Sequence, residues 1–167
     1  MEAIFTRRTI RRYKPDPVSE DDIQDLIRAA MCAPSTGRQE PWQFVIIDDR
    51  ELLKEIQEGF PYGNMIEKVP VAILVCCDQS LEIHKWHGIM DCSAAVENIL
   101  IAANYKKLGS AWLGVYPDDK MMELFRNLVG LPEHVIPFAL VAIGHPAEEK
   151  LPKEKFDSSK IKRNKWE

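Results

Sequence analysis

Apolar residues recur along the chain with two different spacings, which predict alternating helices and strands. The stretch 19–32 is a clear helix, because Ser19 stands at the N-cap position and the apolar residues between Ile23 and Met31 fall on one face. The same spacing predicts further helices at 50–58, 92–107 and 120–129, and a short helix within the first 14 residues. Aromatic, β-branched or continuous apolar runs predict strands at 42–47, 71–76, 111–115 and 137–143.

Strands that alternate with helices imply a layered arrangement around a buried sheet. The length of 167 residues suits one domain, which we place at 1–147. Residues 148–167 form a basic tail of the same domain with three spaced apolar residues, Phe156, Ile161 and Trp166. Such a tail either frays or docks on another surface. The three spaced apolar residues favour docking, and a second subunit is the natural candidate.

Composition and charge exclude several classes of protein. With 46% hydrophobic and 29% charged residues, the chain is neither disordered nor fibrous. Its net charge of -4 argues against a general nucleic-acid binder, which normally carries a basic surplus. No apolar run approaches the ~20 residues that span a bilayer, and the first residues lack a signal-peptide pattern, so we expect no membrane partner and a cytoplasmic location.

The four cysteines are Cys32, Cys76, Cys77 and Cys92. Their spacing suits neither a disulfide framework nor a zinc site, and buried reduced thiols are the simplest expectation.

A cluster of positive charge near the N-terminus stands out from this acidic background. Five cations occupy the eight positions 7–14, with no acid among them. Arginine side chains with the Thr9 hydroxyl could bind a phosphate group, since guanidinium groups supply paired donors. A solvated charged surface is an equally simple explanation from the pattern alone.

Two further segments carry candidate polar chemistry. The loop 33–38 contains two hydroxyls, a glycine and an arginine, which could surround a phosphate or ribityl group but are also common in ordinary loops. His84, His87 and Asp91 suggest a metal site, yet no clear third ligand spacing accompanies the two histidines, and we expect no metal. Because no nucleophile or nucleotide-binding motif is present, the chemistry is expected to depend on a bound cofactor.

Taken together, these segments resemble the nitroreductase family of FMN-dependent oxidoreductases. The matching blocks are 7–13 (RRTIRRY), 33–44 (APSTGRQEPWQF), 91–98 (DCSAAVEN), 109–114 (GSAWLG), 142–146 (AIGHP) and the basic tail with its near-terminal Trp166. The resemblance covers nearly the whole chain. It implies an α+β fold, a three-layer α/β/α sandwich with a central mixed sheet, and an intertwined homodimer with two FMN sites between the subunits.

The resemblance also assigns roles to residues around FMN. The residues that it implies for the phosphate are Arg7, Arg8, Thr9, Lys153 and Lys155. Arg11 would approach the flavin ring, and the backbone of Leu113 and Gly114 would face its reactive edge. The residues implied to reach the same FMN from the partner subunit are Pro34, Ser35, Thr36 and Arg38.

No side chain is then expected to act as acid, base or nucleophile, because the flavin carries the chemistry. The implied activity is hydride transfer from NAD(P)H through the flavin N5 to nitroaromatic, quinone or similar acceptors in a ping-pong cycle. Tyr62, His84 and Trp86 are the expected walls of the substrate pocket.

Three features depart from the family pattern. Arg38 stands where asparagine is frequent, and Glu40 stands where glutamine usually precedes Pro-Trp. The chain is also short for the family, which implies a more open pocket. Two other functions therefore stay open: a specialised flavoprotein of the same fold, such as a dehalogenase-like or flavin-fragmenting enzyme, and a non-enzymatic module that binds nucleic acid or another anion through its basic N-terminus.

Overall fold

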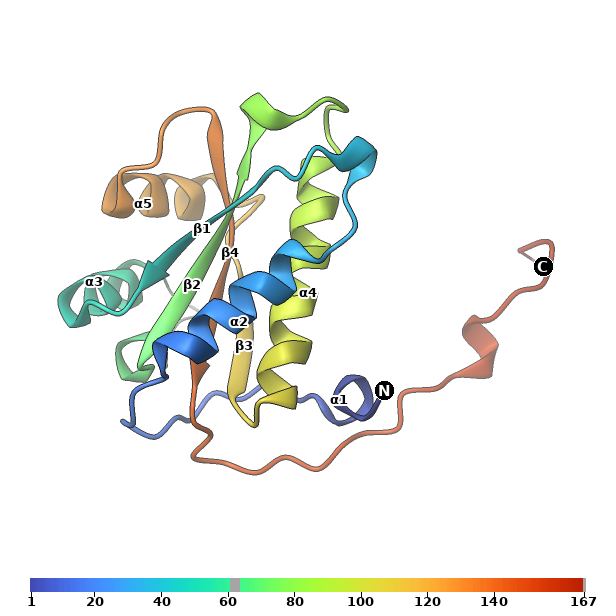
Figure 1. Cartoon of the computed structure of the whole chain (residues 1–167), viewed down its shortest axis with the longest axis horizontal. Coiled ribbons are helices and arrows are strands. Elements are labelled where there is room, and N and C mark those ends of the chain that lie inside the picture. The colour runs from blue at the N-terminus through green and yellow to red at the C-terminus, as the bar shows by residue number, and fades with distance from the viewer. Residues whose placement is uncertain (61–63, 167) are drawn as a thin grey trace.

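The computed structural model describes residues 1–60 and 64–166, and in it a β-sheet is covered by helices on both faces (Figure 1). The helices are α1 (Glu2–Thr6), α2 (Glu20–Met31), α3 (Arg50–Gly59), α4 (Gly88–Tyr105) and α5 (Asp119–Val129), and short 3-10 turns are η1 (Thr36–Arg38), η2 (Ile66–Lys68), η3 (Gln79–Leu81) and η4 (Ser158–Lys160). The strands are β1 (Trp42–Ile47), β2 (Val71–Asp78), β3 (Gly109–Gly114) and β4 (Val135–Gly144). The predicted order of elements and the α+β class are confirmed.

Within the described residues, the four strands form one sheet in the order β1-β2-β4-β3, and every pair of neighbours is antiparallel. The expectation of a mixed sheet is therefore corrected for these strands. Among the described residues, parallel pairing is confined to a single bridge between Thr9 and Ser110, where the N-terminal segment lies beside the edge of β3.

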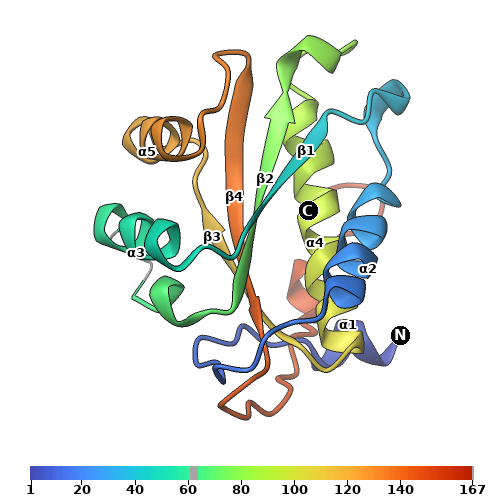
Figure 2. The ribbon, with the colours of Figure 1, turned by 60° about the vertical axis from the view of Figure 1, so that its left-hand side comes forward.

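The sheet separates two hydrophobic cores. Along β2, the odd-numbered residues from Val71 to Cys77 pack with α2 and α4, whereas the even-numbered residues from Ala72 to Cys76 pack with α3 and α5. Alternate side chains of a strand point to opposite faces, so a strand buried on both faces is apolar throughout. Figure 2 shows the resulting layers, with α2 and α4 on one side of the sheet and α3 and α5 on the other.

Helix α4 begins at Gly88, four residues before the expected start. The Glu82 carboxylate accepts a hydrogen bond of 2.9 Å from the Gly88 N–H and so satisfies a donor of the first helical turn. Glu82 lies six residues before Gly88, and the residue at the usual N-cap position is His87 rather than a serine or aspartate. The sequence pattern therefore gave no sign that the helix begins at Gly88.

The cysteine expectation is correct for three of the four positions. Cys76, Cys77 and Cys92 are buried free thiols, but Cys32 is exposed at the end of α2. Burial raises the pKa of Cys76 to about 12, and a side-chain hydrogen bond between Cys92 and Cys77 that favours the neutral Cys92 thiol, followed by burial, raises the pKa of Cys92.

We expect the buried thiols to be unreactive in the folded protein, because they are shielded from solvent and from reagents. A Cys32→Ser variant should release no coloured product from a disulfide reagent under native conditions and should react at all three remaining cysteines after denaturation. Rapid native labelling of this variant would contradict the core described above.

Candidate functional site

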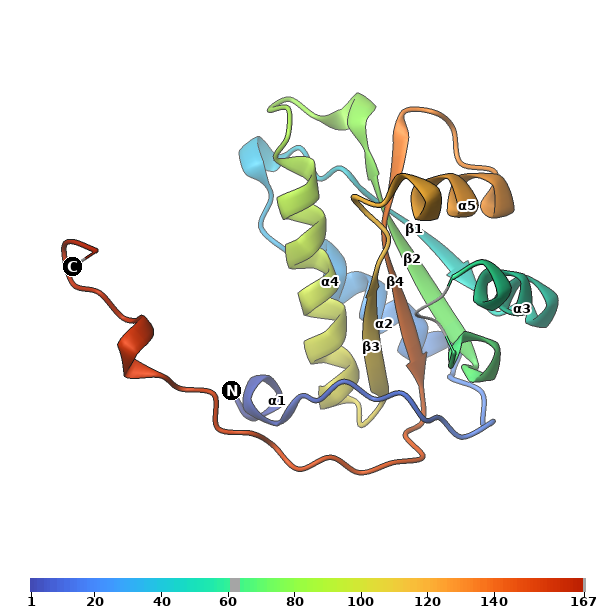
Figure 3. The ribbon, with the colours of Figure 1, turned by 180° about the vertical axis from the view of Figure 1, so that it is seen from behind.

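The basic N-terminal segment lies along the ends of β3 and β4. The Ile10 N–H donates to the Ser110 carbonyl at 2.9 Å, and the Lys14 N–H donates to the His145 carbonyl at 2.8 Å. Pro15 and Pro17 then stop further pairing, because proline lacks the N–H group. Figure 3 shows the segment running from α1 past the lower ends of β3 and β4 towards α2.

The Glu148 carboxylate fixes the middle of this segment. Its Oε1 accepts hydrogen bonds from the backbone N–H groups of Arg11, at 2.6 Å, and Arg12, at 3.2 Å. Lys150 Nζ lies 3.1 Å from the same oxygen and donates to the Thr9 carbonyl at 2.8 Å. The Arg11 N–H bond first, and Lys150 after it, lower the pKa of Glu148 to about 2.

The cations of the cluster do not form a uniformly solvated surface. Arg7 forms an ion pair with Glu97 of α4, with 3.3 Å between Nε and Oε1. Arg8 donates to the Leu151 carbonyl at the start of the tail. Both guanidinium groups are therefore held on the same side of the molecule, close to α4 and the tail.

Arg11 lines a hollow of about 180 Å³ at the edge of the sheet. The other lining residues are Phe60, Met65, Ala111, Trp112, Leu113 and Gly114. In the part of the chain that the structure describes, no carboxylate forms an ion pair with the Arg11 side chain. The structure thus brings the predicted residues Arg11, Leu113 and Gly114 to one hollow and adds Phe60 and Met65.

Within the described residues, the strand at this hollow, β3, lies at the edge of the sheet, and no other strand pairs with its outer side beyond the bridge at Ser110. Because β3 is the last strand of the sheet, only one of its sides pairs with β4. The Ser110 carbonyl points away from β4 to accept from Ile10, and by the alternation of an antiparallel ladder the backbone groups of Gly114 point the same way. A Cβ at Gly114 would meet nothing within 4 Å, so the space beside its Cα is open.

The loop 33–40 lies elsewhere in the chain. Figure 1 places it at the end where α4 begins, whereas α1 lies at the opposite end of that helix. The loop is held from the inside: the Asp91 carboxylate accepts from the Thr36 N–H at 3.1 Å, and Ser35 Oγ accepts from the Glu40 N–H at 3.1 Å. One chain therefore does not bring the residues Pro34, Ser35, Thr36 and Arg38 to the hollow at Arg11.

The remaining predicted residues are distributed as follows. Lys153 and Lys155 are exposed in the tail, which runs beside α1 and away from the body (Figure 1). His84 and Trp86 are exposed in the segment 82–87 before α4. Tyr62 lies outside the described residues.

Residues 1–60 and 64–166 contain no group of three or more His, Cys, Asp or Glu side chains that could hold a metal ion. His84 and His87 instead make an edge-to-face ring contact, with centroids 6.2 Å apart. In the same described residues, no helix is both long and apolar enough to cross a membrane.

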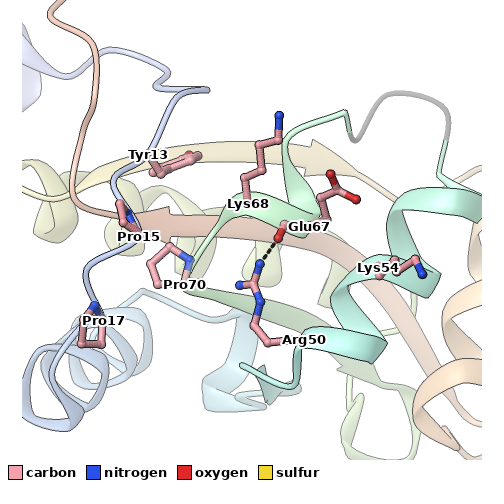
Figure 4. A pocket seen from close by; sticks show the side chains of 8 residues that line it. All are labelled: Tyr13, Pro15, Pro17, Arg50, Lys54, Glu67, Lys68 and Pro70. Atoms are coloured by element: carbon pink, nitrogen blue, oxygen red, sulfur yellow. Dashed lines mark hydrogen bonds between the residues drawn. The ribbon is translucent and has the colours of Figure 1, made fainter.

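A larger hollow, of about 720 Å³, lies between the N-terminal segment and α3 (Figure 4). Arg50 crosses its floor and donates to the carbonyls of Val69, at 2.6 Å, and Glu67. These bonds tie α3 to η2, which is a structural role for the guanidinium. None of the predicted flavin residues lines this hollow.

Two polar residues at the site were missed by the sequence analysis. Glu148 looks like one acid in a charged tail, and Gln39 looks like a loop residue, yet both are hydrogen-bonded to segments far away in the sequence. The resemblance assigned no role to either, although Gln39 lies within the matching block 33–44.

Comparisons with known proteins agree on one family. A family model described as the nitroreductase family matches residues 4–60 and 58–145. A curated protein of Methanothermobacter thermautotrophicus, provisionally named as an NADH dehydrogenase/NAD(P)H nitroreductase, is 46% identical over 99% of this chain and 87% of its own length.

Solved structures give the same result. A crystal structure from Parabacteroides distasonis with the same provisional name has a TM-score of 0.94 and 38% identity, and the match covers 99% of this chain and 97% of that one. An FMN-dependent nitroreductase from Clostridium difficile has a TM-score of 0.89 and 28% identity, with 99% and 100% covered.

The low pKa of Glu148 predicts how stability depends on pH. A carboxylate whose pKa is lower in the folded state stabilises the fold above its ordinary pKa of 4.5, and this contribution is lost as the pH falls from 4.5 towards 2. We expect Glu148→Gln to lower the free energy of unfolding at pH 7 by about 1–2 kcal/mol, allowing for solvent screening. Denaturant titrations should show that the difference in unfolding free energy between the wild type and the variant shrinks below pH 4.5. A difference that is constant from pH 7 to pH 2.5 would contradict the stabilising role of the bonds that the Glu148 carboxylate accepts from Arg11 and Arg12.

Proposed function

Because the chain belongs to the nitroreductase family, we propose how its own residues build an FMN-dependent NAD(P)H oxidoreductase. The observation that carries the proposal is the hollow lined by Arg11 and by Gly114, at the outer edge of β3. When bound, FMN supplies the redox chemistry, by taking a hydride from NAD(P)H and delivering electrons to an acceptor.

The residues around the hollow fit this cofactor. A flavin ring needs an apolar wall and a few polar contacts, and the lining supplies Phe60, Met65 and Leu113 beside the Arg11 cation and the Gly114 N–H. The Arg11 guanidinium would lie near the pyrimidine edge of the ring, where a positive charge stabilises the reduced anionic form. Glu148 accepts a hydrogen bond from the Arg11 N–H, so the backbone that carries this cation is held in place.

A second group of residues suits the phosphate. A phosphate monoester carries a charge of about -1.5 to -2 at neutral pH and is best held by several cationic donors. Arg7, Arg8 and the Thr9 hydroxyl lie on the same N-terminal segment as Arg11. We assign Lys153 and Lys155 to the same phosphate, because the hydrogen bond from Arg8 to the Leu151 carbonyl holds the start of the tail beside the N-terminal cations.

No side chain of this constellation needs to exchange a proton with the substrate. The protein binds and orients the cofactor and the two substrates, which is sufficient for hydride transfer between them. We propose that NAD(P)H and the acceptor bind in turn in the same substrate pocket beside the flavin, with His84 and Trp86 on its wall. The acceptor would be a nitroaromatic, a quinone or a similar planar compound.

The site is completed by a second copy of the chain. Within one chain the loop 33–40 and the segment 7–14 are associated with opposite ends of α4, so Pro34, Ser35, Thr36 and Arg38 would serve the FMN of a partner. An apolar groove of about 400 Å³ between α1, α2 and α4 supports this assembly, and Ile4 and Tyr105 on it are 52% and 78% exposed. The tail residues Phe156, Ile161 and Trp166 are also exposed, at 74%, 61% and 86%.

Removing the phosphate ligands should weaken cofactor binding. We expect Arg7→Ala with Arg8→Ala to raise the dissociation constant of FMN roughly a hundredfold, because two charge-assisted hydrogen bonds are lost. Titration of the apoprotein, followed by quenching of flavin fluorescence, measures this constant. Arg28→Ala with Lys120→Ala removes the same charge from exposed helix positions and should bind FMN as the wild type does; an unchanged affinity in the Arg7/Arg8 variant would refute the assignment.

Removing the apolar residues of the tail should weaken the dimer. The variant Phe156→Ser, Ile161→Ser, Trp166→Ser keeps the hydrogen bonds of Glu148 with Arg11 and Arg12. We expect its dimer dissociation constant to rise at least about a hundredfold, since three apolar side chains that the dimer would bury are removed. Sedimentation over a range of concentrations measures it. Lys162→Ala with Lys165→Ala alters the same tail without removing apolar surface and serves as the control. Equal association of the two variants would show that the tail does not hold the partner.

A further inference from the structure

The first turn of α4 carries a buried carboxylate that is paired entirely with the loop 33–40. Asp91 is 5% exposed. Its Oδ1 accepts from the Thr36 N–H at 3.1 Å and from the Thr36 hydroxyl at 3.3 Å, and its Oδ2 accepts from Gln39 Nε2 at 2.7 Å. A buried carboxylate needs such donors, because an unpaired charge in the interior is costly.

Gln39 extends this network to a third segment. It is 6% exposed, and its Oε1 accepts from the backbone N–H groups of Ile83 and His84, both at 3.1 Å. The orientation of its amide is fixed by these partners, since only this orientation places the NH₂ group on a carboxylate and the oxygen on two donors. Asp91 and Gln39 therefore connect α4, the loop 33–40 and the segment 82–87.

Both connected segments contain residues in the left-handed region of φ. In the loop these are Gly37, Arg38 and Glu40, at 60°, 58° and 46°, and in the other segment it is Trp86, at 75°. Non-glycine residues keep such conformations only where the surroundings hold them. The two segments also touch, because a Cβ on Gly37 would lie 3.0 Å from the His84 ring.

We propose that Asp91 and Gln39 are positioning residues that hold the loop 33–40 and the segment 82–87 as one preformed unit for the partner's FMN site. The inference rests on the proposed function, in which the loop contacts the cofactor and His84 and Trp86 line the substrate pocket. A fully paired buried network selects one arrangement of the segments that it joins. FMN then binds to a surface that is already ordered, so little ordering entropy opposes binding.

The geometry provides a sharp pair of variants. Asp91→Asn keeps an oxygen for Thr36 but turns an NH₂ group towards the NH₂ group of Gln39, and rotating the Gln39 amide only moves the conflict to Ile83 and His84. Adding Gln39→Glu removes the conflict, because a carboxylate at position 39 accepts from the introduced asparagine amide and from both backbone N–H groups. The double variant has the net charge of the wild type and the same number of hydrogen bonds with one of them reversed.

Two readouts test the proposal. For FMN binding by the purified dimer, we expect Asp91→Asn to raise the dissociation constant about tenfold, as expected for a buried donor left unpaired, and the double variant to restore it to near the wild-type value. For amide hydrogen exchange without FMN, we expect Asp91→Asn to speed exchange in the loop 33–40 and the segment 82–87 together, and the double variant to slow both again. Ile99→Val, a buried change on the same helix, should lower stability without either effect.

The outcomes separate the two hypotheses. Exchange in the two segments that is unchanged by Asp91→Asn, or that changes in one segment alone, would overturn the positioning unit. Faster exchange in both segments with unchanged FMN affinity would also overturn it, because the unit would then not serve the cofactor. If the wild type itself binds no FMN, the proposed function fails, while the exchange experiment still decides whether Asp91 and Gln39 join the two segments.

Discussion

The packing of α4 against the sheet is the interaction on which the rest of the structure depends. Its residues Cys92, Ala95, Val96, Ile99, Leu100 and Ala103 are buried in the core that it shares with α2 and the sheet. Three polar residues on the same helix then hold the surrounding segments: Asp91 holds the loop 33–40, Glu97 pairs with Arg7, and Asn104 donates to Ala3 and Thr6 of α1. Full burial of a valine, isoleucine or leucine side chain, as at Val96, Ile99 and Leu100, stabilises the fold by about 1.5–3 kcal/mol, so the helix is a firm support for these contacts.

This support also explains why the proposed site is shared. With 18 residues and a rise of about 1.5 Å per residue, α4 is about 27 Å long. It holds the loop 33–40 at Asp91 in its first turn, and it contacts the basic segment through Glu97 near its middle and α1 through Asn104 in its last turn. A twofold axis between two copies would place the loop of one chain against the basic segment of the other, twice in the same dimer. The exposed groove beside α1 and the exposed apolar residues of the tail are the surfaces that such a dimer would cover.

The sequence was sufficient for the elements of the fold and for part of the site. Periodicity located the long helices and the strands, because a buried helix face and a doubly buried strand each impose a spacing on apolar residues. The resemblance named Arg11, Leu113 and Gly114, which line one hollow in the structure; their role at a flavin stays a prediction. It also singled out Arg38 and Glu40 as departures, and both have positive φ, which asparagine adopts more readily than arginine at position 38.

What could not be predicted depends on single polar residues that meet across the fold. Glu148 lies 137 positions from Arg11, and Asp91 lies 52 positions from Gln39, so no local pattern links either pair. The antiparallel order of the sheet and the cap of α4 by Glu82 likewise depend on how segments are placed in space. Burial also failed to follow residue type at Cys32, where a short thiol at a helix end stays exposed.

The most direct test of the central claim is the visible spectrum of the purified protein before and after anaerobic addition of NADPH or NADH, with identification of the flavin released on denaturation. The account predicts a yellow protein with about one FMN per chain, bleached by at least one of the two nicotinamides. A colourless protein that also fails to bind added FMN, or a yellow protein whose flavin neither nicotinamide reduces, would contradict it.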